Sequence, residues 1–177
     1  TAQLEMHGIT PMRIEAMDGR LIKDHTTLGY DDAHALRYMG RSMTPGEIGC
    51  CESHRRALRA FVASGETMAM VFEDDITFEN DAADTLHEVL DWLRATELDW
   101  HCVNIGAKRL KITTPVATLG ACRLLRAHYF PMLAHALIWH RAGANAYLEA
   151  AAHMFCPADN LMRHVLTRSD KGYATWP

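Results

Sequence analysis

Three consecutive acidic residues, Glu73, Asp74 and Asp75, directly follow an apolar run over residues 67–72. A short continuous apolar run predicts a buried strand, and open α/β sheets bind ligands beyond the carboxyl ends of their strands. Adjacent carboxylates repel one another, and partial burial raises the cost of their charge. A hard divalent cation would relieve both effects and would bind a nucleoside diphosphate. The alternative is a solvated loop, or acids that cap the next helix.

The longest predicted helix begins with a complete capping motif. Thr44 takes the N-cap position, Pro45 the first helical position and Glu47 the third. This pattern forms a capping box in which the missing N–H of proline costs nothing. The helix is expected to run to about Ser64, where Gly65 ends it.

On this helix, His54 is predicted to point inward among apolar side chains, whereas Ser53 lies well to the side. The two residues therefore cannot form a nucleophilic pair, because adjacent helical residues do not face each other. His54 is either a hydrogen-bonded core histidine or, with Glu47 and Cys50, part of a ligand pocket. Cys50 is interpreted as a packing residue rather than a nucleophile, since nothing nearby clearly lowers its pKa.

The rest of the chain alternates between strand and helix patterns, which predicts an α/β fold with a mixed, mostly parallel sheet flanked by helices. Further strands are expected at residues 12–16, 101–105, 122–125 and 135–140, with a loop at 107–121. Helices are expected near 30–39, after caps at Asn80 and Asp81, and at 141–153 and 160–167. Residues 1–177 suffice for one domain. Residues 1–8 resemble the end of a helix closed by Gly8, so the natural protein is expected to be longer.

Composition argues against several classes of protein. The net charge is −4, whereas a general nucleic-acid binder is usually basic, so we expect no nucleic-acid partner. Five cysteines without a C-x-x-C pair fit reduced thiols in a cytoplasmic protein better than a disulfide framework. The longest apolar run falls short of the roughly 18 residues that a membrane span needs. Peripheral contact at the inner face of the cytoplasmic membrane remains compatible with the sequence.

Six short stretches, taken together and in this order, resemble glycosyltransferase family 25. This family contains lipooligosaccharide galactosyltransferases and their collagen-modifying relatives. The stretches are AMDGR at 16–20, MTPGEIGC at 43–50, SH at 53–54, VFEDD at 71–75, HALI at 135–138 and PADN at 157–160. Each stretch alone is a weak signal, but their order and spacing over nearly the whole chain are specific.

The resemblance implies a GT-A-like, Rossmann-like fold that lacks the family's first strand, and a UDP-sugar donor, with galactose as the expected sugar. It implies that Glu73 and Asp75 hold Mn²⁺ or Mg²⁺ as an acid-x-acid pair, with Asp74 beside the donor. Asp18 and Gly19 are expected near the nucleotide. The acceptor is expected to be an oligosaccharide or lipid-linked glycan of the lipooligosaccharide type, and the transfer is expected to invert the anomeric carbon.

Inversion in a single displacement needs a base that takes the proton of the acceptor hydroxyl. Asp159 is the candidate for this base. Its position after Pro157, at the start of a predicted helix, equally fits a simple cap. His135 is a second candidate for the base or a third metal contact, unless it is a buried strand histidine.

Two other kinds of protein fit the same residues. A metal-dependent phosphohydrolase would use the acidic run to activate water, and it would need no sugar acceptor. A non-catalytic family relative would keep the fold as a binding module.

Overall fold

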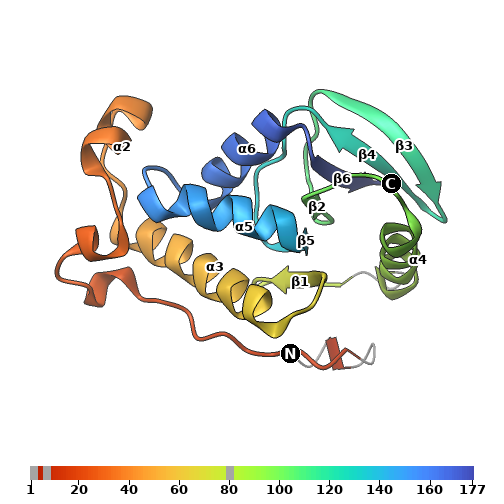
Figure 1. Ribbon diagram of the computed structural model, residues 1–177, viewed down its shortest axis with the longest axis horizontal. Coiled ribbons are helices and arrows are strands. Elements are labelled where there is room, and N and C mark those ends of the chain that lie inside the picture. Colours follow the sequence, from red (N-terminus) through yellow and green to blue (C-terminus); the bar gives the residue numbers. More distant parts are fainter. Residues whose placement is uncertain (1–3, 6–8, 79–81) are drawn as a thin grey trace.

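The structure is a computed structural model that describes residues 4–5, 9–78 and 82–177, and these contain one six-stranded sheet (Figure 1). The strands are β1 Met68–Phe72, β2 Cys102–Asn104, β3 Thr113–Leu119, β4 Cys122–Ala127, β5 Ala136–His140 and β6 Gly172–Trp176. Their order across the sheet is β1-β5-β2-β6-β4-β3. The strands predicted at 67–72, 101–105, 122–125 and 135–140 are thereby confirmed.

The strand directions correct the predicted sheet. Within the described residues, β2 and β6 form the one parallel pair, and the other four pairings are antiparallel. The prediction of a mostly parallel sheet is therefore wrong. One reason is that β5 lies between β1 and β2 and runs antiparallel to both. Another is that β3 connects to β4 through a turn at Gly120, and such a short connection allows only antiparallel pairing. β1, β2, β6 and β3 nevertheless run in one common direction.

Two strands lie outside the predicted set. β3 occupies much of the segment expected to be a loop, and it contains Pro115. The strand tolerates this proline because it lies at the edge of the sheet, with a register shift between Pro115 and Ala117. β6, close to the chain's last residue, has no counterpart among the predicted strands. Conversely, the strand expected at 12–16 does not form, and none of the described strands pairs with this segment.

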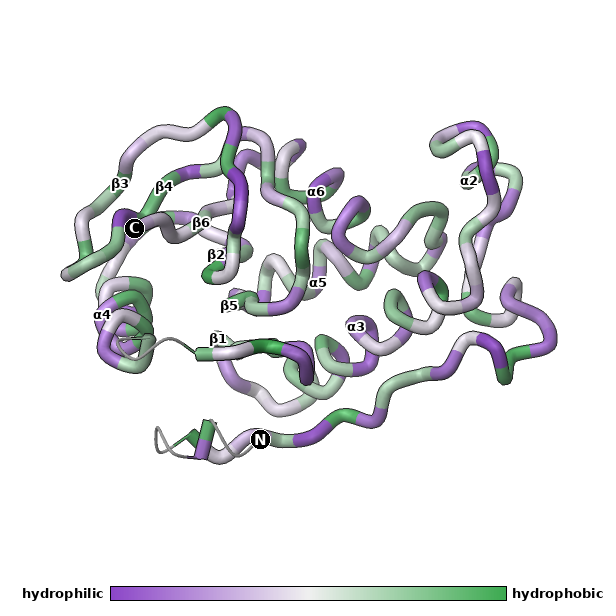
Figure 2. The backbone as a smooth tube through the Cα atoms, turned by 180° about the vertical axis from the view of Figure 1, so that it is seen from behind, coloured by the Kyte–Doolittle hydropathy of each residue, from purple (hydrophilic) through white to green (hydrophobic). Residues whose placement is uncertain are grey.

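Alternating side chains of the central strands supply two cores on opposite faces of the sheet. Leu137 and Trp139 of β5 pack with three helices, whereas Ile138 between them packs with a fourth. The three helices are α3 Pro45–Ser64, α5 Arg141–Ala150 and α6 Ala158–Ser169, and the fourth is α4 Ala82–Ala95. Figure 2 shows α4 apart from this group, beside β1 and β3. The predicted α/β fold with flanking helices is confirmed.

Short helical elements precede α3 at one end of the molecule (Figure 1). They are η1 Gly19–Leu21, η2 His25–Leu28 and α2 Asp32–Met39, and a further turn, η3 Ala151–His153, follows α5. The expected helices near 30–39, 141–153 and 160–167 are therefore present as α2, α5 with η3, and α6. Gly8, Asn80 and Asp81 lie outside the described residues. None of the described helices is long and apolar enough to cross a lipid bilayer.

Candidate active site

Three chain segments meet at one edge of the sheet. β1 and β2 end at this edge and β5 begins there, since Phe72 pairs with Ala136. The backbone N–H of Glu73 extends the ladder by donating to the carbonyl oxygen of His135, at 2.9 Å. Two of the predicted site residues are thus fixed side by side by the sheet itself.

A cleft of about 210 Å³ opens at this edge. It is lined by Glu47 and Cys50 of α3, by Glu73, and by residues 133–135 and 157–159. Four of the nine predicted site residues therefore line one cleft, although they are far apart in the sequence. They are Glu47, Glu73, His135 and Asp159.

The three consecutive acids do not share one environment. Along β1, Val71 packs toward the core under α3 and Phe72 toward the core under α4. Glu73 continues this alternation onto the α3 side, where its partly buried side chain lines the cleft. Asp74 and Asp75 follow in a turn and are exposed, outside the cleft lining. Only the first acid of the run is therefore held inside the protein.

His54 supplies the counter-charge of Glu73. Its side chain is only 5% exposed, and Nε2 lies 3.2 Å from Oε1 of Glu73, so the predicted inward orientation is confirmed. Burial alone would lower the pKa of His54, but the nearby side chains of Cys50 and Glu73 outweigh it and raise that pKa to about 9. The hydrogen bond from His54 also lowers the pKa of Glu73.

This ion pair changes the electrostatic argument for a cation. At neutral pH a protonated imidazole already compensates the carboxylate of Glu73, and water solvates the exposed Asp74 and Asp75. Mutual repulsion of three acids therefore does not by itself require a metal. The assignment of a metal to Glu73 and Asp75 rests instead on their oxygen donors and on their position at the carboxyl end of β1.

Glu47 fixes the N-terminus of α3 at the cleft. Its backbone N–H donates to Oγ1 of Thr44, and its Oε2 accepts from the N–H of Thr44 at 2.8 Å, which confirms the predicted capping box. The guanidinium of Arg41 pairs with the same carboxylate at 2.7 Å. Chiefly because of the hydrogen bond from Arg41, the pKa of Glu47 falls to about 2.

Replacing Glu47 by Gln is expected to lower the free energy of unfolding by about 1 kcal/mol at pH 7, since the side chain keeps 25% exposure. The folded pKa of Glu47 is about 2 and its ordinary value is 4.5. A depressed pKa stabilises the fold above the ordinary value, so the difference between the wild-type protein and the variant should shrink as pH falls from 4.5 toward 2. Urea unfolding at several pH values measures it.

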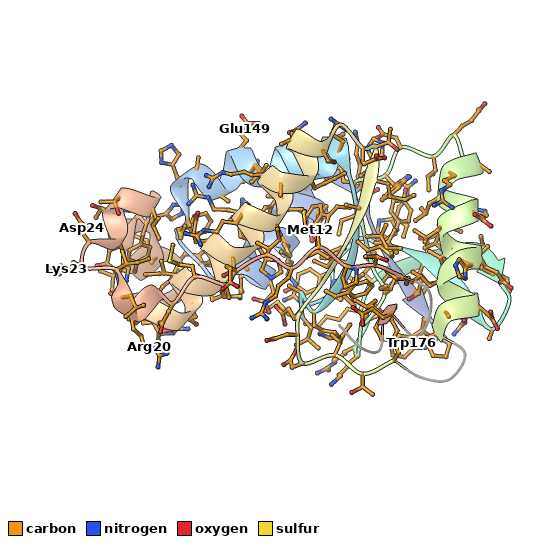
Figure 3. The ribbon with its side chains drawn as sticks, turned by 90° about the horizontal axis from the view of Figure 1, so that it is seen from below. Met12, Arg20, Lys23, Asp24, Glu149 and Trp176 are labelled. Carbon is orange, nitrogen blue, oxygen red and sulfur yellow. The ribbon has the colours of Figure 1, made fainter. Side chains whose placement is uncertain are left out.

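The matched control is Glu149→Gln, at an exposed residue of α5 that projects into solvent in Figure 3. It should change stability little at any pH. An unfolding free energy of the Glu47 variant that stays below the wild-type value by a constant amount down to pH 3 would contradict the assigned role of the carboxylate charge.

Asp159 lies in the first turn of α6, whose N-cap position is held by Pro157 without a side-chain hydrogen bond. Oδ1 of Asp159 accepts from the N–H of Asn160 at 2.8 Å, and the residue lines the cleft. Pro157 rather than Asp159 occupies the N-cap position, but Asp159 still accepts a first-turn N–H, so its capping role and its role as a base both stay predictions.

His135 packs directly over Gly106, the second residue of the loop that follows β2. A Cβ atom at Gly106 would lie 2.4 Å from Nε2 of His135. His135 is partly buried and lines the cleft, so the alternative of a fully buried strand histidine does not hold. The histidine can present its ring to a ligand because Gly106 leaves room for it.

Asp18 and Gly19 are fastened to α3 rather than to the cleft lining. The Gly19 backbone crosses α3 so closely that a Cβ atom would lie 1.8 Å from the carbonyl oxygen of Pro45. Ser53 accepts a hydrogen bond from the N–H of Met17 at 2.9 Å, so its hydroxyl has a structural role. Asp18 itself pairs with the outward-pointing Arg20 (Figure 3). The expected nucleotide contact of Asp18 and Gly19 stays a prediction.

Comparison with known proteins assigns this chain to a family. The profile of "Glycosyltransferase family 25 (LPS biosynthesis protein)" matches residues 1–120, about two thirds of the chain. The chain belongs to glycosyltransferase family 25. The stretches at 135–138 and 157–160 that support the resemblance lie beyond this match, yet they contribute to the cleft.

Individual relatives of this family 25 chain carry two kinds of name. "Inactive glycosyltransferase 25 family member 3" of Homo sapiens is 32% identical over 142 residues, which cover 77% of this chain and 24% of the relative. "Procollagen galactosyltransferase 2" of Homo sapiens is 30% identical over 125 residues, covering 66% of this chain and 19% of the relative. The chain thus spans about a quarter or less of the length of these relatives.

One residue that shapes the family 25 cleft is absent from the predicted set. Asn104 is fully buried at the end of β2; its Nδ2 donates to the carbonyl oxygen of Leu133 at 2.8 Å, and its Oδ1 accepts from the N–H of Gly106 at 3.0 Å. Leu133 lines the cleft with a φ of 74°, a left-handed conformation that is rare for leucine. The sequence signal for Asn104 is a polar residue at the carboxyl end of an apolar strand, and Glu73 has the same kind of position after β1.

Proposed function

We propose that this chain carries the donor and acceptor site of a glycosyltransferase that moves a sugar from a UDP-sugar to a glycan. The observation that carries the proposal is the gathering of Glu47, Glu73, His135 and Asp159 around one cleft at the carboxyl end of β1. Membership of glycosyltransferase family 25 supports this class of reaction. The relatives named procollagen galactosyltransferase favour galactose as the sugar, and the family description favours a lipopolysaccharide-type acceptor.

Glu73 in the cleft and Asp75 just outside it fit a hard divalent cation by their chemistry. Glu73 and Asp75 offer carboxylate oxygens, the ligands that Mn²⁺ and Mg²⁺ prefer. His54 bonds to Oε1 of Glu73, and a carboxylate has further lone pairs on its second oxygen. When bound, the cation would offset the negative charge of the departing diphosphate. Asp74, Asp18 and Gly19 would then contact the nucleotide from outside the cleft.

The chemical step proposed for this cleft is a single displacement. The acceptor hydroxyl oxygen forms a bond to the anomeric carbon while the bond from that carbon to the diphosphate oxygen breaks. The hydroxyl proton passes to the carboxylate of Asp159, and the configuration inverts. His135, directly before β5, is the second candidate for the base.

Changing Asp159 to Asn is expected to lower kcat about 100-fold with little effect on KM for the donor, because only proton acceptance is removed. Initial rates with UDP-galactose and a saccharide acceptor measure this change. Asp91→Asn, at an exposed residue of α4 remote from the cleft lining, serves as the control. If His135→Gln loses activity and Asp159→Asn does not, the base is His135 and the assignment of Asp159 is wrong.

A direct assay tests the function as a whole. The protein is incubated with radiolabelled UDP-galactose and Mn²⁺, with and without a lipooligosaccharide acceptor, and both free galactose and labelled glycan are measured. Labelled glycan that appears only with acceptor and cation supports the proposal. Release of free galactose or phosphate at the same rate without acceptor would identify a hydrolase instead.

A second candidate function is a non-catalytic binding module, and two observations favour it. Several relatives are named as inactive, in Homo sapiens and in Mus musculus. In addition, His54 already neutralises Glu73 without a metal. Calorimetry with UDP, in the presence and absence of Mn²⁺, separates the candidates. A module without a donor site releases no heat with UDP, whereas a transferase should bind UDP more tightly when Mn²⁺ is present.

A further inference from the structure

A second kind of cation site is formed inside the cleft by three side chains of different chemistry. Cys50, His54 and Glu73 each offer one ligand atom, and these three atoms all lie within 4.8 Å of one another. Cys50 and His54 are four residues apart on α3, so they lie one turn apart on the same helix face. Glu73 reaches them from the end of β1. The cluster therefore joins the two elements that form the cleft wall.

The chemical nature of these three ligand atoms determines which metal ions the site would prefer. A thiolate, an imidazole and a carboxylate suit Zn²⁺, Co²⁺ and Cd²⁺, whereas Mg²⁺ and Mn²⁺ prefer oxygen ligands alone. Three protein ligands with a fourth position open to a cleft are the arrangement of reactive zinc sites. From ordinary zinc bond lengths, tetrahedral ligand atoms lie about 3.5 Å apart. Since no two of the three atoms are more than 4.8 Å apart, side-chain movements of up to about 1 Å would bring them to this spacing.

The surroundings of His54 provide a second observation. Its side chain is 5% exposed, and Nδ1 is buried without a hydrogen-bond partner among the described residues. A buried ring nitrogen without a partner is costly. Nε2 lies 3.2 Å from Oε1 of Glu73. The imidazole is therefore held beside Glu73 by Nε2, while its Nδ1 has bonding capacity that the described residues leave unused.

Access to the site is provided by Cys50. It is the one exposed cysteine of the chain, whereas the other four are buried, and it lines the cleft. A cation can thus reach its thiol without opening the core. We propose that Cys50, His54 and Glu73 bind one thiophilic divalent cation of the Zn²⁺ class. The site shares Glu73 with the proposed Mn²⁺ site, but it goes beyond the proposed function, because its occupation requires neither a donor sugar nor transfer.

The test is a titration of the reduced, metal-free full chain with Co²⁺ in the absence of oxygen. We expect a near-ultraviolet thiolate-to-cobalt absorption band that saturates at one equivalent, together with the visible bands of a tetrahedral ion. Zn²⁺ should abolish both, and a large excess of Mg²⁺ should not. Cys50→Ser should remove the thiolate band, and His54→Gln or Glu73→Gln should weaken Co²⁺ binding at least about 10-fold.

Two control variants and one direct measurement keep the test decisive. Cys122→Ala and His153→Ala change a cysteine and a histidine outside the cluster, and they should leave the titration unchanged. Alkylation of Cys50 in the wild-type protein, read by mass spectrometry, should slow when Zn²⁺ is added, and it needs no variant that has to fold. The proposal is overturned if the wild-type protein shows no band at a severalfold excess of Co²⁺. It is equally overturned if the band survives Cys50→Ser or is indifferent to both His54 and Glu73.

Discussion

Replacing Glu73 by Gln is expected to reduce sugar transfer about 1000-fold, which corresponds to the several kcal/mol of charge stabilisation that a bound cation supplies. Glu73 is the one acid of the run that lines the cleft, and His54 holds its orientation. The amide keeps the shape of the side chain but loses the charge. Initial rates with UDP-galactose as a function of Mn²⁺ concentration measure the loss. Glu149→Gln on α5 serves as the control for a surface carboxylate.

Asp75→Asn tests the second half of the acid pair and has an expected outcome of its own. It should abolish metal-dependent transfer, although Asp75 is exposed in the turn after Glu73. Circular dichroism and thermal melting should show both variants folded. Full activity in Asp75→Asn combined with loss in Glu73→Gln would restrict the metal role to Glu73. Full activity in both variants would show that neither acid holds a cation that transfer requires, and the metal assignment would then be wrong.

The parts of the fold that follow from local sequence could be predicted, and the strand order could not. The start of α3 was fixed by Thr44 and Glu47, whose capping box is a contact between residues three apart. β6 was missed because its identity as a central strand depends on partners far away in the chain, β2 and β4. It also begins with Gly172, which the ring of Phe130 covers so closely that a Cβ atom would lie 2.5 Å away.

Within the site, too, the features set by local sequence could be predicted, whereas those set by distant residues could not. Helical periodicity correctly placed His54 inside, and strand alternation accounts for the inward position of Glu73. The bond between these two side chains joins residues 19 apart in sequence. Asp74 and Asp75, unlike Glu73, are exposed because a turn begins immediately after Glu73. The run of three acidic residues in the sequence does not indicate where this turn begins. The candidates Asp159 and His135 came from family motifs, and the structure brings both to the cleft.

The largest effect on stability is expected from Gly49→Ala, which should lower the free energy of unfolding by about 3 kcal/mol. A Cβ atom at Gly49 would lie 2.4 Å from the carbonyl oxygen of Met17 and 2.7 Å from the backbone nitrogen of Gly19. Both are backbone atoms, so no side-chain rotation can relieve the overlap. The segment that carries Asp18 must therefore move off α3. For a chain of this size, thermal melting should show Tm lower by about 6 to 12 °C.

Gly46→Ala, in the first turn of the same helix, is expected to have the opposite effect on the free energy of unfolding. A Cβ atom at Gly46 meets no atom within 4 Å, so the substitution only restricts the unfolded chain and should raise stability by up to about 1 kcal/mol. The two alanines share helix propensity, and they differ only in what their methyl groups contact. If both variants melted at or above the wild-type temperature, α3 and the segment at residues 17–19 could not be packed backbone to backbone. The expected contact of Asp18 and Gly19 with a nucleotide beside α3 would then lose its structural basis.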